Sequence, residues 1–210
     1  MNKKNVLSCL AGAWVSLLCS CVVPESTYVA PDFFLLSPVS LDANYTHDNE
    51  NKSFYLSQVE IPEYLRDLRM VSRPDKHSVV FREGKRWGEP LTDGIARVVA
   101  LNMSRELNTS FFSVFPNRKE RELAWDVSLS VTSFGRSNSD SVELVALWEI
   151  DGEDPNGTQR GSFSINLPID DNKTDDIKSE LRGLNDCLQS LALRLSGVIS
   201  ECSDSPPKRN

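Results

Sequence analysis

The stretch of sequence that decides the fold reads WDVSLSVT at residues 125–132. Its apolar side chains alternate with polar ones, which is the two-residue period of a β-strand with one buried face. Residues 142–150 alternate in the same way, but Val145 and Leu147 make the second face of this strand apolar as well. We therefore expect residues 142–150 to form a central strand that is covered on both sides.

Shorter strands are expected on either side of these two. Each is a run of β-branched, aromatic or aliphatic residues that ends at a turn-forming residue. The predicted strands cover residues 33–36, 53–61, 70–72, 78–81, 111–115 and 163–167.

Two long helices are predicted from apolar residues that recur at steps of three and four. The first covers residues 90–107, and Pro90 is expected at its first helical position, where a missing N–H costs nothing. The second covers residues 174–199. Its apolar seam consists of Ile177, Leu181, Leu184, Leu188, Leu191, Leu195 and Val198.

Such a seam can pack along a sheet or meet a partner helix. We favour the sheet, because that arrangement needs no second chain. The sequence therefore predicts an α/β fold, a single domain in which a mixed β-sheet is packed by two long helices.

The composition permits a folded core and excludes several classes of function. Of the 210 residues, 40% are hydrophobic and 25% are charged. Asp and Glu number 30 against 23 Lys and Arg, which gives a net charge of −7. This balance argues against nucleic acid as a partner, since phosphate binding needs clustered cations. It also argues against adsorption to an anionic membrane by charge alone.

The sequence contains none of the common catalytic, phosphate-binding or dinucleotide-binding motifs. His47 and His77 both lie in polar turn regions. The acidic residues at 170–176 lack the glycine and glutamate spacing of a calcium loop, and those at 149–154 fit a solvated hairpin tip better than a metal site. We therefore expect no enzyme activity, no cofactor and no metal.

The first twenty residues are typical of a secretion signal. Lys3 and Lys4 precede an apolar stretch that is too short for a comfortable transmembrane helix. The stretch ends in Leu18-Cys19-Ser20-Cys21, which resembles a bacterial lipobox with Cys21 as the lipidated residue. Plain secretion and a retained membrane anchor are the alternatives. By resemblance to bacterial lipoproteins, Val22 after the cysteine favours the periplasmic face of the outer membrane.

These features divide the chain into a signal peptide at 1–20, a tether at 21–32, a folded domain at 33–201 and a disordered tail at 202–210. Two cysteines remain in the mature domain and tail besides Cys21. A helix that runs through Cys187 and Cys202 would hold them about 22 Å apart. A disulfide needs Cα atoms within about 7 Å, so pairing would require the tail to fold back, and the sequence leaves this open.

Residues 59–102 carry a family resemblance. They contain a Pro-x-Tyr-Leu turn, an aliphatic-Val-x-Arg strand, and an Arg-Trp-x-Glu-Pro-Leu block that opens the first helix. The matching positions are Pro62, Tyr64, Leu65, Arg73, Trp87, Glu89, Pro90, Leu91 and Asn102. This pattern resembles the PqiC family of lipoprotein auxiliary components in ABC-type and MCE-type envelope transport. The similarity extends more weakly to residues 34–38 and to the strand around Trp148. Asp67-Leu68 stands where the family carries Arg-Pro.

The resemblance implies an α/β domain that works as a lipid-anchored partner of an MCE-domain protein in lipid transport between membranes. The expected mechanism is anchoring and docking without covalent chemistry, and a homo-oligomer is left open. The alternative is a lipoprotein that carries a lipid or small molecule in a pocket between helix and sheet. An envelope hydrolase is a third hypothesis, which the missing motifs disfavour.

The matching residues can also be explained by stability alone. Glu89 would lie near the positive end of the first helix, Trp87 could pin the preceding chain to the core, and Arg73 could reach Glu89. For Tyr64 and Arg73, a structural role and a partner contact are equally open. Asn102 falls inside an apolar stripe, where we expect it to bond a nearby backbone group rather than a ligand.

Overall fold

The computed structural model describes residues 29–39, 49–117, 123–138, 140–152, 157–169 and 177–203. Residues Pro31–Asn210 belong to one compact unit, and of the residues before it only 29 and 30 are described. The predicted signal peptide, Cys21, most of the tether and residues 204–210 lie outside the described residues. So do the acidic residues at 170–176.

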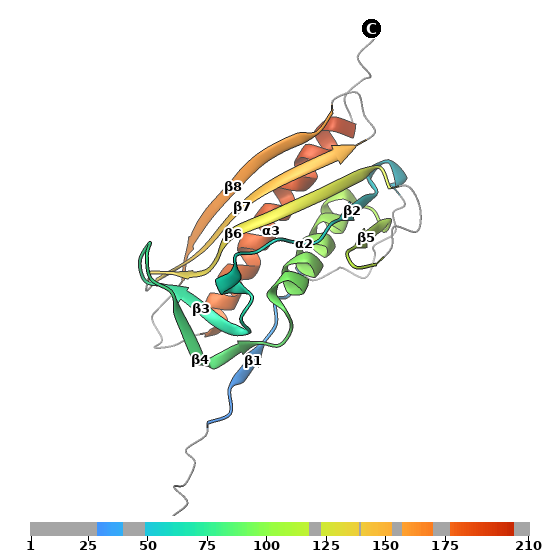
Figure 1. The fold of residues 1–210 in the computed structure, drawn as a ribbon. Coiled ribbons are helices and arrows are strands. Elements are labelled where there is room, and N and C mark those ends of the chain that lie inside the picture. The colour runs from blue at the N-terminus through green and yellow to red at the C-terminus, as the bar shows by residue number, and fades with distance from the viewer. Residues whose placement is uncertain are drawn as a thin grey trace, which may run out of the picture. The chain divides into compact units, whose positions relative to one another are not determined.

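The predicted alternating strands form the centre of a mixed sheet (Figure 1). Strand β6 (Trp125–Ser137) pairs antiparallel with β7 (Ser141–Gly152), which pairs antiparallel with β8 (Gln159–Pro168). The β6–β7 register shifts at a bulge between Val131 and Ser133. The strongest periodic signals in the sequence thus mark the longest strands.

The other edge of β6 is shared by segments that follow one another along the chain. Strand β2 (Phe54–Leu56) lies parallel to the start of β6, Glu60 bridges to Ser130, and β3 (Arg69–Arg73) lies parallel to its end. Between Glu60 and β3 the chain leaves the sheet in a short 3₁₀ helix, η2 (Glu63–Leu65). The predicted strand at 53–61 is therefore interrupted, because Val59 and Ile61 turn into the core.

Three further strands complete the sheet. Strand β5 (Phe112–Val114) pairs with β2, β4 (Val80–Trp87) pairs with β3, and β1 (Asp32–Phe34) pairs with β4. A short 3₁₀ turn, η1 (Glu50–Lys52), precedes β2. Strand β4 is longer than the predicted strand at 78–81, since the polar residues after Phe81 concealed its continuation.

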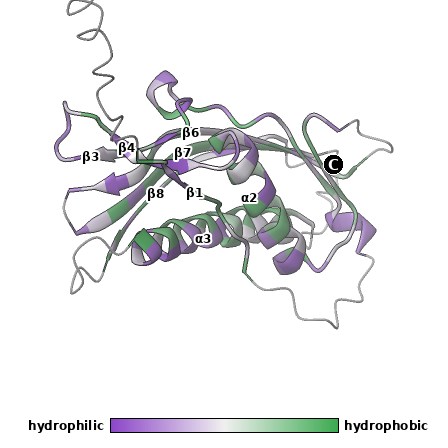
Figure 2. Ribbon diagram, turned by 90° about the horizontal axis from the view of Figure 1, so that it is seen from below, coloured by the Kyte–Doolittle hydropathy of each residue, from purple (hydrophilic) through white to green (hydrophobic). Residues whose placement is uncertain are grey.

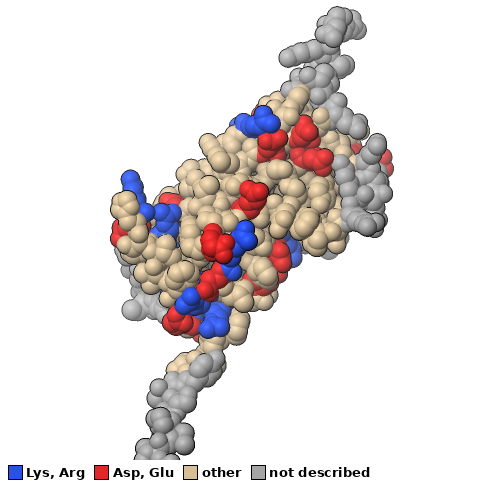
Figure 3. All heavy atoms as spheres, viewed as in Figure 1, with Lys and Arg blue, Asp and Glu red and all other residues tan. Residues whose placement is uncertain are grey.

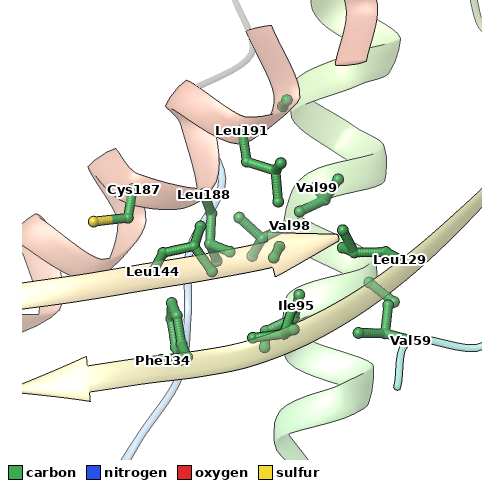
Figure 4. Packing of buried hydrophobic residues seen from close by; sticks show 14 of the residues in the cluster. Val59, Ile95, Val98, Val99, Leu129, Phe134, Leu144, Cys187, Leu188 and Leu191 are labelled. Atoms are coloured by element: carbon green, nitrogen blue, oxygen red, sulfur yellow. The ribbon is translucent and has the colours of Figure 1, made fainter. Parts of the chain in front are cut away.

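Helices α2 (Leu91–Leu107) and α3 (Ile177–Ser203) lie together on one face of the sheet (Figures 1 and 2). Their apolar side chains meet those of β6 and β7, as Figure 4 shows for Val98, Leu188 and Leu144. From Leu184 to Val198 the seam of α3 is buried against the sheet and α2, while Ile177 and Leu181 at its start are half-buried. This packing confirms the predicted single α/β domain. Burial of this face supplies the main hydrophobic stabilisation of the fold.

The prediction that residues 142–150 are covered on both sides is wrong. Strand β7 is central in the sheet, but on the face away from the helices Val145 is only half-buried and Leu147 is 53% exposed. Core packing therefore does not explain why Val145 and Leu147 are apolar, since no described element covers this face.

The helix ends differ from the predicted ones in two places. Pro90 is not the first helical residue: its ψ of 132° is extended, and its carbonyl accepts the N–H groups of Asp93 and Gly94. Helix α3 continues to Ser203 and so contains both Cys187 and Cys202, which are not joined by a disulfide. Burial raises the pKa of the Cys187 thiol to about 12, so it stays protonated.

Two tryptophans lie across glycines of the neighbouring strand. Trp125 is paired with Gly152, and Trp148 is paired with Gly161. In each pair a Cβ on the glycine would overlap the indole ring, so only glycine leaves room for it. These pairs resemble the aromatic cover of glycine that pins register in other sheets.

We predict that Gly161→Ala lowers stability by about 1–3 kcal/mol, because the added Cβ overpacks against the Trp148 ring. For a chain of this size that corresponds to a melting temperature lower by roughly 2–4 °C per kcal/mol, measurable by thermal unfolding. Gly84→Ala is the matched control, since Gly84 lies in β4 with open space where its Cβ would be. Equal melting temperatures for the two variants would contradict this packing.

Candidate functional site

The residues that carry the family resemblance fall into two separate groups. The first group lies where β4 passes into α2, and it faces an extended segment, residues 35–39, that follows β1. We call this segment the strap. The Leu36 side chain of the strap is buried, while Leu35 is exposed and Val39 is half-buried.

Three side chains from the two helices hold the backbone of the strap. Arg97 of α2 donates from Nη2 to the Leu36 carbonyl at 3.0 Å. Asn185 of α3 accepts the Ser37 N–H at 3.0 Å, and Asn102 of α2 accepts the Val39 N–H at 3.0 Å. The strap is thus tied to both helices, although the residues involved lie far apart in the sequence.

Glu89 orients the first of these three side chains. Its Oε1 pairs with Nη2 of Arg97 and lies over the first turn of α2, where a Cβ on Gly94 would approach it to 3.1 Å. The expected position near the positive end of the helix is confirmed. The expected pair with Arg73 is wrong, because Arg73 lies at the end of β3 and reaches Ser133, Glu143 and the Lys76 carbonyl instead.

The rest of this group is explained by packing. The Trp87 side chain is buried. Its backbone lies opposite Phe34 in the β1–β4 register, and its backbone N–H donates to the Leu68 carbonyl at 2.7 Å. Leu91 is also buried at the start of α2. Asn102 is 3% exposed, and its bond to Val39 is the structural backbone contact that the sequence predicted. Its Nδ2 has no hydrogen-bond partner among the described residues.

The second group lies around η2. The Pro62 carbonyl accepts the Leu65 N–H at 3.0 Å, and this turn drives the buried Leu65 side chain into the core. Tyr64 donates from its hydroxyl to the Thr132 carbonyl at a long 3.4 Å. Arg73 donates to Ser133 Oγ at 3.0 Å. Tyr64 and Arg73 therefore meet β6 at neighbouring residues, beside its bulge.

Asp67, where the sequence departs from the family pattern, is engaged within the chain. It accepts two bonds from the Arg69 side chain and one from the Arg69 N–H. These hydrogen bonds lower the pKa of Asp67 to about 2. Arg69 also pairs with Glu83 and lies 4.6 Å from the centre of the Phe81 ring. The substituted position thus stabilises the turn before β3.

The open face of the sheet, opposite the helices, holds a hollow of about 630 Å³. Leu147 stands at this hollow among small polar residues of β6 and β8, and Ser57 Oγ donates to Ser128 Oγ at 3.1 Å on one side. At its rim Arg160 pairs with Glu149 at 2.7 Å, and this bond lowers the pKa of the Glu149 carboxyl. Figure 3, which views this face, shows broad uncharged stretches over β6 to β8.

A buried ion cluster escaped the sequence analysis. Glu180 of α3 is 1% exposed and accepts two hydrogen bonds from Arg82 of β4, while Arg136 of β6 lies 3.8 Å away. The sequence held a signal for it, since Glu180 falls on the buried side of the apolar seam at three residues from Ile177. This cluster fixes the start of α3 against two strands.

The described residues contain no group of three His, Cys, Asp or Glu side chains that could hold a metal ion. None of the described helices combines the length and the apolarity that crossing a bilayer requires. Among the described residues, the geometry offers a strap that is bonded to both helices and an uncovered sheet face with a hollow that suits binding.

Comparison with known proteins gives a family and a fold. Residues 34–195 match the model of a family described as ABC-type transport auxiliary lipoprotein component. A crystal structure of an uncharacterized protein is similar with a TM-score of 0.65 and 15% identity, over 81% of this chain and 99% of that one. A Xanthomonas campestris protein assigned to family DUF330 is similar with a TM-score of 0.59 and 12% identity, over 82% and 95%. No curated protein matches.

We predict that Asn102→Ala loosens the strap, because it leaves the partly buried Val39 N–H without its hydrogen-bond acceptor. The expected cost is about 1–3 kcal/mol, with faster hydrogen exchange at the Val39 amide. Asn185→Ala is the comparison variant: it removes an equivalent bond to Ser37 at an exposed position, where water replaces the lost partner. If both variants cost the same, the burial of Asn102 is not what makes its bond important.

Proposed function

The chain belongs to the family of ABC-type transport auxiliary lipoproteins, and from this premise we propose that it is the docking component of an MCE-type lipid transport system. A lipid on Cys21 holds the protein at the periplasmic face of the outer membrane. The folded domain binds an MCE-domain protein and keeps the transport assembly close to that membrane. The mechanism is anchoring and binding, without catalysis.

The strap supports the anchoring part of this proposal. The chain enters the sheet at β1, which pairs with β4, and then passes directly into the strap. Any pull on the N-terminus therefore acts first on strand pairing and on the bonds from Arg97, Asn185 and Asn102. An anchored domain needs such a connection between tether and core.

The uncovered sheet face supports the docking part, and it is the observation that carries the proposal. Protein interfaces commonly have an apolar centre that is surrounded by polar groups. Leu147 and the hollow beside it provide the centre, while Ser130, Ser162 and the Arg160–Glu149 pair provide the rim. Exposed Leu147 has no role in the core, and a partner surface explains its presence.

The hollow also favours a second candidate function, that of a carrier. Its volume of about 630 Å³ is in the range of small-molecule sites. The side chains between the helices and the sheet are fully buried, so a bound lipid would lie on the open face rather than in the position expected from the sequence. Lipid analysis of natively extracted protein separates the two functions: copurified lipid favours the carrier, and a copurified MCE-domain protein favours docking.

We predict that Cys21→Ala releases the protein from the membrane fraction into the soluble periplasm, because no acyl chain then holds it. Fractionation and mass spectrometry of the mature N-terminus measure this. Cys19→Ala is the matched control, since it changes a cysteine two residues earlier and leaves the lipidated position intact. A Cys21→Ala protein that stays in the outer membrane would contradict the anchor.

We predict that Leu147→Asp weakens binding to the MCE-domain protein at least tenfold, because it puts a charge at the centre of the proposed interface. Leu193→Asp is the matched control: Leu193 is 46% exposed, close to the 53% of Leu147, but it lies on α3. Binding of purified proteins and thermal unfolding are measured for both. Equal loss of binding in the two variants would show that the open face is not the docking surface.

A further inference from the structure

The described sheet ends in three edges, and one of them is unusual. Strands β1 and β5 are three residues long, and such short edges offer little backbone for pairing with another chain. Strand β8 is ten residues long, and among the described residues it pairs only with β7. Its register with β7 is continuous, without a bulge.

The residue content of β8 does not protect this edge either. Natural sheets commonly guard long edges with lysines, inward-pointing charges, prolines or bulges. In β8 the only charged residue is Arg160, near one end, and the only proline is Pro168, at the other. The middle of the strand reads GSFSIN at residues 161–166.

The register shows which backbone groups point away from β7. The Ile169 N–H donates to the Asp140 carbonyl at 2.8 Å, and these two residues continue the β7–β8 register. Because hydrogen-bonded and non-hydrogen-bonded pairs alternate, residues 161, 163, 165 and 167 bond to β7. Residues 160, 162, 164 and 166 therefore direct their N–H and C=O groups outward. Pro168 fits this pattern, since it needs no N–H there.

The side chains of β8 are arranged for a further strand. Phe163, Ile165 and Leu167 lie on the helix side and are only half-buried, although they pack against the core. Ser162, Ser164 and Asn166 lie on the open face and are exposed. A neighbouring strand with the same alternation would cover the first row and leave the second row in solvent.

We propose that this edge pairs antiparallel with β8 of a second copy of this chain, with the two-fold axis at Ser164. Ser164 then faces Ser164 of the second copy, and Ser162 faces Asn166, through the outward backbone groups. Phe163 faces Ile165 of the second copy in a non-hydrogen-bonded pair, where side chains approach most closely.

The sequence of β8 favours a second copy over an unrelated strand. About Ser164 the strand is self-complementary, since apolar residues meet apolar ones and uncharged polar residues meet polar ones. Arg160 faces Pro168 of the second copy, so the only charged residue of the strand does not lie opposite the same residue of the second copy. The two sheets join into one, and both helix layers lie on the same side. This inference goes beyond the proposed docking function and does not rest on it.

Disulfide trapping tests the register. We expect Ser164→Cys in the full-length protein, purified in detergent with Cys202→Ser to limit background, to form an intermolecular disulfide under mild oxidation. Cα atoms of a hydrogen-bonded antiparallel pair lie about 5.5 Å apart, within disulfide range. Ser162→Cys and Asn166→Cys alone should not crosslink, since each lies roughly 14 Å from its own copy. The double variant should crosslink.

A proline variant tests the edge itself. Ser164→Pro removes one outward N–H and no bond to β7, so the fold is retained while the pairing is blocked. We expect wild type to be a dimer by light scattering, and Ser164→Pro to be a monomer with an unchanged circular dichroism spectrum. Ser164→Thr should remain a dimer.

Several outcomes would overturn the proposal. One is a monomeric wild type without a Ser164→Cys crosslink, and another is equal crosslinking at residues 162, 164 and 166. A third is a monomeric wild type that loses a copurifying transport protein on Ser164→Pro, because the edge would then serve a different partner.

Discussion

The architecture depends on pairing along both edges of β6. One edge pairs with β7 over its full length, and the other accepts β2, Glu60 and β3 in sequence. These segments run parallel to β6, but the chain leaves the sheet at η2. The thirteen residues from Glu60 to Ser72 therefore span only the distance from Ser130 to Arg136. The surplus chain becomes the turn that places Leu65 in the core and Tyr64 beside β6.

The strap explains a role of the motif residues around the start of α2, which lie far from it in the sequence. Glu89 orients Arg97, and Arg97 and Asn102 bond the backbone of residues 36 and 39. An extended segment outside the sheet leaves its N–H and C=O groups without ladder partners, and buried backbone groups must be satisfied. Side chains from the helices supply these partners here. The motif residues Glu89 and Asn102 thus help to hold the start of the domain against its core.

Periodicity alone predicted the long strands, both helices and their packing, because burial of one face imposes periods of 2 and 3.6 on the sequence. It failed where position depends on contacts between distant segments. The Arg73–Glu89 pair was wrong because nothing in the sequence tells at which end of the sheet each residue lies. Leu147 was assigned to a covered face because exposed and buried leucines read alike. Glu180 was missed because a single charge in an apolar seam is recognised only when its arginine partners are known.

The cluster around Glu180 bears on specificity more than on stability. Burying an ion pair costs solvation that the attraction between the charges only partly returns, so a hydrophobic replacement would stabilise the fold about as well. A seam of leucines, however, can slide along a sheet by one turn at little cost. Bonds from Arg82 and the nearby Arg136 fix Glu180, and with it the register of α3 on β4 and β6. With α3 fixed on one face, the β1 entry point lies apart from the open face, so anchoring uses residues that docking does not. The open face and the β8 edge adjoin each other, because Arg160 and Ser162 belong to both.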